Sequence, residues 1–281
     1  MKQLHPYAGK TAYLATQHGK GALIAPAFQS ILDMDVVEVA VNTDQLGTFA
    51  GEVERVGTPR EVALKKAHLA ISATTSPYGL ASEGSIGVDP LIPFINSDIE
   101  LIAFVDKTLG IEVVESIRST EIVAASVRVD KNTDLQEFLS KADFPRHRII
   151  VRSLDIPVSF AVKGIATAAE LDNALTQGFA NFESLVVESD LRAHCSPSRQ
   201  ANIASVAQKL ATRLAALCPE CSTPGWGVQG FTKGLPCSEC GEISHEALKS
   251  EILGCAKCSY KADGKVLAVA IDPSQCNVCN P

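Results

Sequence analysis

The chain has 281 residues, of which 46% are hydrophobic, and its formal net charge is −7. This length suffices for a large core and favours two domains, while the acidic balance disfavours a sequence-independent grip on nucleic acid, which needs clustered lysine and arginine. No apolar run approaches the roughly 18 residues of a membrane span, and the N-terminus lacks the apolar core of a signal peptide. We therefore expect a cytoplasmic protein that does not enter a membrane.

The first predicted elements are a strand over residues 11–15 and a helix over residues 22–32, joined by a loop that carries Thr16, His18 and Lys20. Backbone N–H groups and the helix dipole favour an anion at the start of such a helix. The loop lacks the G-x-x-x-x-G-K-[ST] spacing of a P-loop. It is a candidate phosphate site, and a plain solvated turn is the alternative.

A second strand is predicted over residues 36–41, and after a polar loop Glu52 and Glu54 alternate with Val53. In an extended segment both carboxylates point to the same side, where they repel one another unless a cation lies between them. Mg²⁺ prefers such hard oxygen ligands and keeps waters and substrate phosphates. A solvent-facing edge strand with two glutamates is the alternative explanation.

The sequence Thr-Pro-Arg-Glu over residues 58–61 predicts a helix start, with Thr58 and Glu61 in a capping box and proline at the first helical position. Apolar residues at helical spacing continue to residue 71 and give the buried face, which leaves Lys66 toward the edge or the solvent. In the simplest interpretation, Glu61 is only a cap and Lys66 a solvated lysine.

A short buried strand is predicted over residues 80–82, followed by Glu83 and a glycine-rich loop over residues 84–87. A carboxylate at a strand end beside glycines can reach a metal or a phosphate without side-chain crowding. Glu83 is therefore a candidate catalytic residue.

Thr58, Glu61 and Lys66 fall in the order of the Thr-x-x-Glu-x-Ala-Leu-x-Lys-Ala helix of inosine triphosphate pyrophosphatase-like (Maf-like) enzymes. The segment over residues 80–84 resembles the strand that ends in a carboxylate and glycines in that family. The resemblance covers roughly the first 125 residues. It implies a mixed sheet flanked by helices, and Mg²⁺-dependent cleavage of nucleoside triphosphates to monophosphate and pyrophosphate.

The loop after the first strand is similar to the Thr-x-Asn-x-x-Lys motif that contacts the triphosphate in the same enzymes. Thr16 and Lys20 match this motif, whereas His18 stands in place of the asparagine. The resemblance thus implies a phosphate-binding role for Thr16 and Lys20, and the departure at His18 affects the contacts with base and phosphate.

The rest of the first part alternates strands and helices, which predicts an α/β architecture for residues 1–215. A hairpin is expected over residues 99–116, a helix over residues 130–142 and another over residues 167–176. A further helix begins at Ser196, which we expect to cap it, with proline at its first position.

A strand over residues 185–187 leads into a loop that carries Asp190, Arg192 and His194. A carboxylate with a histidine suits proton transfer, and an arginine suits phosphate binding, so Asp190 and His194 are further catalytic candidates. Structural residues in salt bridges would give the same pattern. Cys195 is expected to be a small buried residue rather than a nucleophile.

Eight of the nine cysteines form C-x-x-C pairs, which in a reducing compartment indicates metal rather than disulfides. The pairs are Cys218/Cys221, Cys237/Cys240, Cys255/Cys258 and Cys276/Cys279. Two such pairs complete one tetrahedral Zn²⁺ site, so we predict two structural zinc ions in a zinc-ribbon-type domain over residues 216–281, whose folding depends on them.

The spacing leaves the pairing of these cysteines open. In a consecutive arrangement the first pair joins the second and the third joins the fourth. In a nested arrangement the second joins the third, which the hairpin-like sequence between residues 240 and 255 favours.

The cysteine-rich segment has more acidic than basic residues, and each Cys₄ zinc site adds about two negative charges. A protein partner or a purely structural role is therefore expected for it, and nucleic acid is not.

Over nearly its full length the chain resembles an uncharacterised family of bacterial proteins. The shared motifs are the His-Gly-Lys loop, Thr-Asp-Gln-x-Gly-Thr, Gly-Glu-x-Glu-Arg, Ala-Ser-Glu-Gly-Ser, Arg-Ala-His and the terminal Cys pairs. This resemblance brings no activity with it.

Three functions are consistent with these patterns. The predicted one is a Mg²⁺-dependent phosphoanhydride hydrolase in which Glu61 and Glu83 hold the metal, Glu83 is the general base, and Lys66 and the loop over residues 16–21 bind the phosphates. Glu52 or Glu54 is an alternate metal ligand. The other two functions are a non-catalytic nucleotide- or phosphate-binding protein on the same fold, and a zinc-ribbon adaptor with an α/β scaffold.

Overall fold

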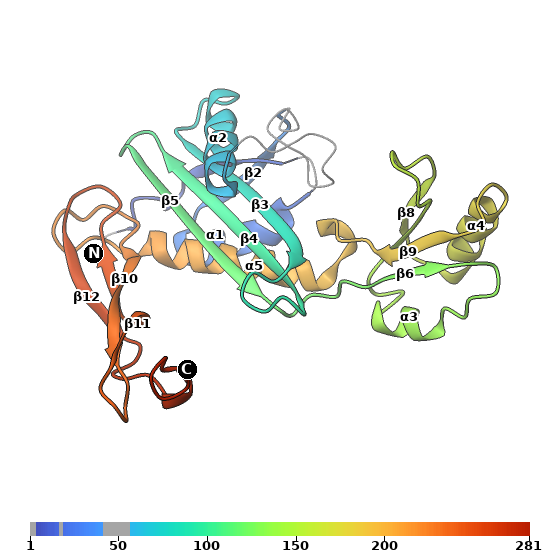
Figure 1. Cartoon of the computed structure of the whole chain (residues 1–281). Helices are drawn as coiled ribbons and strands as arrows, with labels where there is room; N and C mark the ends of the chain where they lie inside the picture. The colour runs from blue at the N-terminus through green and yellow to red at the C-terminus, as the bar shows by residue number, and fades with distance from the viewer. Residues whose placement is uncertain (1–3, 17–18, 42–56) are drawn as a thin grey trace.

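The computed structural model of the chain describes residues 4–16, 19–41 and 57–281. Within these residues the strands form a five-stranded, a four-stranded and a three-stranded sheet, called here the large sheet, the small sheet and the C-terminal sheet. Figure 1 shows the large sheet in the middle, with the other two at opposite ends of helix α5 (Pro197–Ala215). The architecture is mixed α/β with a cysteine-rich C-terminal segment.

The large sheet has the order β2-β1-β3-β4-β5 and is mixed. Strands β1 (Thr11–Ala15), β2 (Asp35–Val39) and β3 (Tyr78–Val88) run parallel to one another. Strands β4 (Asn96–Asp106) and β5 (Ile111–Ser119) complete it in antiparallel register. The predicted hairpin is confirmed as β4 and β5.

Helices cover both faces of the large sheet. Helix α1 (Gly21–Leu32) and α5 pack on one face around buried residues such as Leu80 and Phe104, while α2 (Pro59–Ser72) packs on the other. The chain therefore leaves β1 toward one face and enters β3 from the other. Since β1 lies between β2 and β3, its C-terminal end is a topological switch point, the place where open α/β sheets bind ligands.

Helix α2 begins as its sequence predicts, with a capping box between Thr58 and Glu61. It lies close to the sheet because its inner face is built from small residues such as Ala67. A Cβ added to Gly79 of β3 would lie 2.2 Å from the Ala67 carbonyl oxygen, so only glycine permits this approach.

Strand β3 is longer than predicted. It pairs with β4 without interruption from Tyr78 to Val88, so Glu83 lies in the middle of a strand and not in a glycine loop at its end. The expectation of a strand ending at residue 82 was wrong, because antiparallel pairing with the long strand β4 keeps the glycine-rich sequence extended.

Residues 126–189, called here the small lobe, form an antiparallel sheet of order β6-β9-β7-β8. Its elements are β6 (Ser126–Val129), α3 (Gln136–Lys141), β7 (Ile149–Arg152), β8 (Ala161–Ile165), α4 (Ala168–Phe179) and β9 (Leu185–Ser189). They enclose a core of their own, which includes Phe138, Ile149 and Leu185.

Helix α3 is shorter than the helix predicted over residues 130–142. The Asp130 carboxylate accepts from the N–H of Asn132, and the Asp134 carboxylate accepts from the N–H of Gln136. Such local bonds from aspartate compete with helical hydrogen bonds, and so the helix begins only at Gln136.

The C-terminal sheet is an antiparallel meander of β10 (Gly227–Pro236), β11 (Ile243–Gly254) and β12 (Lys261–Val266). The segment that leads into it is held at the end of α5 by Arg213, whose Nε donates to the Gly225 carbonyl at 3.3 Å. The same guanidinium binds the Glu115 carboxylate of β5 at 2.6 Å. The predicted boundary between residues 215 and 216 lies at the end of α5. Among the described helices, none has both the length and the apolar character needed to cross a membrane.

Candidate functional site

Buried charged side chains gather near the C-terminal end of β1. The last paired residue of β1, Ala15, lies opposite Ala81 of β3, so Glu83 lies just beyond this strand end. The charged cluster consists of Lys20, Lys66, Glu83, Asp98, Glu100 and Arg199, each at most 8% exposed. Burying charges is costly unless they are paired, and a group of them at a ligand-binding position of the fold marks a candidate functional site.

Lys66 and Glu83 form an ion pair between α2 and β3, with 2.6 Å between Nζ and Oε1. Both side chains are nearly inaccessible to solvent. The expectation that Lys66 faces the edge or the solvent was therefore wrong, because a strand residue distant in sequence supplies its partner. The pair brings together two of the residues that the sequence analysis assigned to catalysis and phosphate binding.

Lys20 approaches the same strand from the loop before α1, and its Nζ donates to Ser82 Oγ at 3.1 Å. Burial lowers the pKa of Lys20 below its ordinary value, and the carboxylates of Glu100 and Glu83 act in the opposite direction. An ammonium group held in this way gains from any additional negative charge nearby.

On the α5 side of the cluster, two residues of α5 pair with two carboxylates of β4. Arg199 Nε donates to Glu100 Oε1 at 2.5 Å, and Asn202 Nδ2 donates to Asp98 Oδ2 at 2.9 Å. Burial raises the pKa of Glu100 and of Asp98 above their ordinary values, against the opposing effect of nearby groups that include Arg199. A Cβ at Gly84 would lie 2.4 Å from Arg199 Nη2, so a larger residue at this position would force the Arg199–Glu100 pair to shift.

The N-terminus of α1, predicted to bind phosphate, already has a carboxylate against it. Glu38 of β2 accepts from the N–H of Gly21 at 2.5 Å. The sequence analysis did not single out Glu38, since nothing in its spacing shows that β2 directs it toward α1. Thr16 directly follows β1, and a phosphate contact from Thr16 or Lys20 stays a prediction.

Glu61 lies at the exposed start of α2, where its Oε2 accepts from both the N–H and the Oγ1 of Thr58. This bears out the capping interpretation, and a metal-binding role for Glu61 stays a prediction. His18, Glu52 and Glu54 lie outside the described residues.

Asp190 forms its ion pair with Arg192, whose side chain donates through Nε and Nη2. Burial raises the pKa of Asp190, but the hydrogen bonds from Arg192 outweigh it and leave the pKa below its ordinary value. His194 is exposed on the short 3₁₀ turn that follows, and the neighbouring Cys195 is buried, as expected. The structure thus joins Asp190 to the arginine and not to the histidine.

A cavity of about 970 Å³ lies between the small lobe and the edge of the large sheet where β3 ends and β4 begins. Ile86 and Asn96 line it on the side of the large sheet, and Asp190 and Arg192 on the other. Lys163 of β8 is exposed on its wall, so the cavity combines apolar surface with positive charge.

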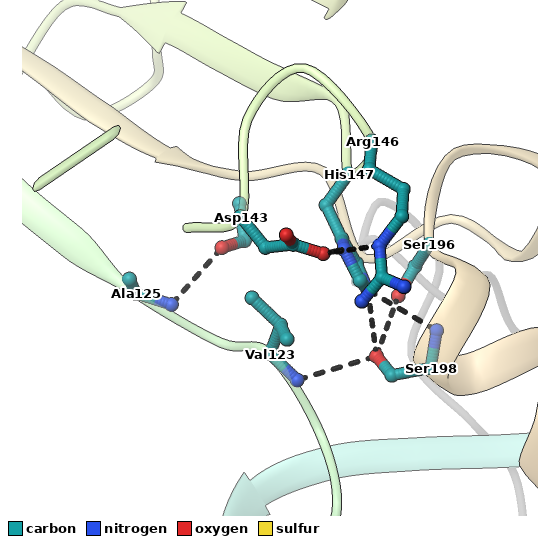
Figure 2. Close-up of polar contacts among 8 residues, drawn as sticks. Val123, Ala125, Asp143, Arg146, His147, Ser196 and Ser198 are labelled. Atoms are coloured by element: carbon teal, nitrogen blue, oxygen red, sulfur yellow. Dashed lines mark hydrogen bonds and ion pairs between the residues drawn. The ribbon is translucent and has the colours of Figure 1, made fainter. Parts of the chain in front are cut away.

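Asp143, His147 and Ser198 form a second polar group, which the sequence analysis missed (Figure 2). His147 is 1% exposed. The available signal was the four-residue spacing between an aspartate and a histidine within a turn, which is weak because the partner Ser198 lies 51 positions away from His147.

The cysteine pairs assemble into two groups that could each hold a metal ion, with all sulfur atoms of a group within 4.8 Å of one another. The proximal group comprises Cys218, Cys221, Cys255 and Cys258, and the distal group comprises Cys237, Cys240, Cys276 and Cys279. Contacts of 3.5–3.8 Å between sulfurs agree with the ~3.8 Å that four sulfurs at about 2.3 Å from a tetrahedral zinc would show.

This pairing is neither consecutive nor nested, and both predicted arrangements were wrong. Each cysteine pair lies at one end of a long strand of the C-terminal sheet, and ten residues of β10 span on the order of 30 Å. The chain therefore reaches the distal end after β10, returns along β11 and leaves again along β12. The first and third pairs meet at one end, and the second and fourth at the other.

A family model described as a domain of unknown function (DUF6671) matches residues 66–281. The matched part begins at Lys66 in α2 and includes Glu83, Arg199 and both cysteine groups. No curated protein matches the chain.

Proposed function

The chain belongs to the DUF6671 family, and we propose that it is a Mg²⁺-dependent hydrolase of nucleotide phosphoanhydrides built on an inosine triphosphate pyrophosphatase-like fold. The observation that carries this proposal is the buried Lys66–Glu83 pair beside Lys20 at the switch point of the large sheet. Two ammonium groups and a carboxylate at a ligand-binding strand end suit a phosphate substrate.

In the proposed mechanism, the phosphates of a nucleoside triphosphate contact Lys20 and Lys66. Their charges stabilise the negative charge that develops on the phosphate oxygens in the transition state, and the water-poor surroundings strengthen this effect. Burial already lowers the pKa of Lys20, so a bound phosphate stabilises the charged form of this lysine.

Glu83 is the proposed general base. A water molecule attacks the α-phosphorus and gives its proton to the Glu83 carboxylate, while the bond to pyrophosphate breaks and the electron pair leaves with the pyrophosphate oxygen. Lys66 holds the Glu83 carboxylate in place at 2.6 Å before the reaction.

Glu83 is proposed to help hold Mg²⁺, which is often bound by one or two carboxylates together with substrate phosphates and waters. Glu83 is the buried carboxylate on the α2 side of β3, and Glu61 at the start of α2 is the second ligand from the sequence analysis. Bound there, Mg²⁺ would polarise the scissile phosphate and lower the pKa of the attacking water.

The cysteine groups are proposed to hold two structural zinc ions. Four thiolates form a closed tetrahedral donor set, which leaves no position for a substrate. Among the described residues, the distal group packs against a small cluster around Leu235 and Ile271, so metal binding is proposed to supply most of the stability of that end.

The proposal is tested with a Glu83→Gln variant. This variant keeps the size of the side chain and a hydrogen-bond acceptor for Lys66, so it should still bind nucleotide but lose turnover by at least the 10²-fold typical of general-base removal. A matched control is Glu112→Gln, because Glu112 is an exposed carboxylate on β5 that binds only His68 among the described contacts. A Glu83→Gln variant with parental turnover would refute the assignment.

The second candidate is a nucleotide-binding protein without catalysis. The buried Lys20 and Lys66 support it as well, because they suit a bound phosphate whether or not it is cleaved. This candidate predicts that the protein binds nucleotides with Mg²⁺ and leaves them intact. Thermal shift with a nucleotide panel separates this candidate from a zinc-ribbon adaptor, which should show no shift with any of them.

A further inference from the structure

The start of helix α5 has no cap from its own sequence. Ser196 at the N-cap position makes no side-chain hydrogen bond to a backbone N–H of the helix, in contrast to the sequence-based expectation, and its Oγ contacts only the Ser198 hydroxyl among the described side chains of α5. Instead, the N–H of Ser198 in the first turn donates to Nε2 of His147 at 3.1 Å. A side chain from the small lobe therefore satisfies one of the free N–H groups at the start of this 19-residue helix.

The contacts of His147 indicate its tautomer. Nδ1 lies 2.8 Å from Oδ2 of Asp143. Nε2 faces the N–H of Ser198, a contact that Figure 2 marks with a dashed line. A carboxylate accepts and a backbone N–H donates, so the proton is on Nδ1 and Nε2 carries a free electron pair. Asp143 is itself held by the Arg146 guanidinium.

The arrangement resembles the Ser-His-Asp constellation of hydrolases, because Ser198 Oγ lies 3.0 Å from Nε2. Two contacts argue against a nucleophilic serine. The electron pair of Nε2 is directed at the backbone N–H of Ser198, and Ser198 Oγ accepts from the N–H of Val123 at 3.2 Å. In addition, neither His147 nor Ser198 lines the cavity beside the small lobe.

The residue after Ser198 connects this cap to the charged cluster. Arg199 donates to Glu100 through Nε and to the Leu191 carbonyl through Nη1 at 2.8 Å. A shift of the first turn of α5 would move the Arg199 backbone directly, and its side chain has little room because Gly84 and Glu100 lie against it.

We propose that His147 is a positioning residue, which caps α5 from the small lobe and thereby holds Arg199 in the charged cluster. The role in catalysis rests on the proposed function, whereas the cap itself does not. In this role His147 touches no substrate and acts only through the first turn of α5.

The cap is tested by amide hydrogen exchange of residues 198–200 and by ¹⁵N NMR of the His147 ring in the parent protein. The ring should show a protonated Nδ1 and an unprotonated Nε2. His147→Leu should speed exchange of the Ser198 amide about tenfold, as expected for the loss of one hydrogen bond. His147→Gln places an oxygen acceptor near the position of Nε2 and should restore slow exchange.

Ser198→Ala is the matched control, because it removes the hydroxyl and keeps the backbone N–H. It should retain both slow exchange and nucleotide hydrolysis. Loss of hydrolysis in Ser198→Ala with unchanged amide exchange would overturn the proposal in favour of a catalytic serine. A ring protonated on Nε2 would overturn it even if His147→Leu did not fold.

The link to Arg199 is tested by combining His147→Leu with Arg199→Lys. If His147 acts through Arg199, the double variant should have the same kcat/KM as Arg199→Lys alone, and His147→Gln should recover the parental value. Additive losses would overturn the link. If the parent hydrolyses no nucleotide, the proposed function fails, while the exchange and NMR results still decide whether His147 caps α5.

Discussion

The sulfur atoms of Cys221 and Cys255 lie 3.5 Å apart although 34 positions separate them in the sequence. This contact defines the interleaved pairing of the cysteine groups and gives a direct test of it. Cys221→Ser/Cys255→Ser should lose one of two zinc ions, because both changes affect the proximal group. Cys221→Ser/Cys240→Ser should lose both, because it affects one ligand of each group.

Metal analysis of the purified variants measures how many zinc ions each one retains. The consecutive and nested arrangements both predict loss of two zinc ions from Cys221→Ser/Cys255→Ser, so retention of one ion excludes them. Cys195→Ser is the control and should leave the zinc content unchanged, since Cys195 belongs to neither group.

Arg199 and Glu100 form an ion pair in which the two side chains are 3% and 0% exposed. Removing one partner leaves a buried charge uncompensated, so Arg199→Met should lower the free energy of unfolding by about 3–5 kcal/mol. Glu100→Gln/Arg199→Met should recover part of this loss. Denaturant unfolding measures both, and a loss below about 1 kcal/mol in the single variant would mean that the pair behaves like an exposed one.

Asp89 anchors the turn between β3 and β4, where it accepts from the N–H groups of Leu91 and Ile92. The hydrogen bonds from the Arg118 guanidinium hold the pKa of Asp89 below its ordinary value. The folded state therefore binds this proton less readily than the unfolded chain. The stabilisation is complete above pH 3.8, the ordinary pKa of the group, and is lost as the pH falls toward the folded-state pKa.

Thermal unfolding between about pH 2 and pH 6 checks this prediction. Asp89→Asn removes the titrating group, so the variant should be less stable than the parent at pH 6 and its stability should fall less steeply in acid. Parallel curves for variant and parent would contradict the assignment.

Glu61→Gln separates the two roles considered for this residue. Glutamine also completes a capping box, so the free energy of unfolding should change little. If Glu61 contributes to the metal site, removal of its charge should lower the rate of hydrolysis. The loss should be smaller than that of Glu83→Gln, because Oε2 of Glu61 already accepts two hydrogen bonds from Thr58. A loss as large as that of Glu83→Gln would make Glu61 an equal partner in the metal site.

Features that depend on nearby residues could be predicted from the sequence. The capping box of α2 requires only Thr58 and Glu61, three positions apart, and it forms as expected. The four C-x-x-C pairs likewise indicate two metal sites without any knowledge of the fold.

Features that depend on residues distant in the sequence could not be predicted. Lys66 has the position of a solvated helix lysine until β3 brings Glu83 beside it. In the same way, Ser196 has the identity of a cap, but the acceptor for the first turn of α5 comes from His147 in the small lobe. The pairing of the cysteines was also predicted wrongly, because it depends on how the strands between the pairs return, and these strands place successive pairs at opposite ends of the C-terminal sheet.

The proposed hydrolase activity is measured by incubating the zinc-replete parent protein with a panel of nucleoside triphosphates and Mg²⁺ and identifying the products. We expect release of nucleoside monophosphate and pyrophosphate from at least one of them, dependent on Mg²⁺ and abolished by Glu83→Gln. Absence of hydrolysis across the whole panel, with Mg²⁺ or Mn²⁺ and with the protein shown to be folded, would contradict it.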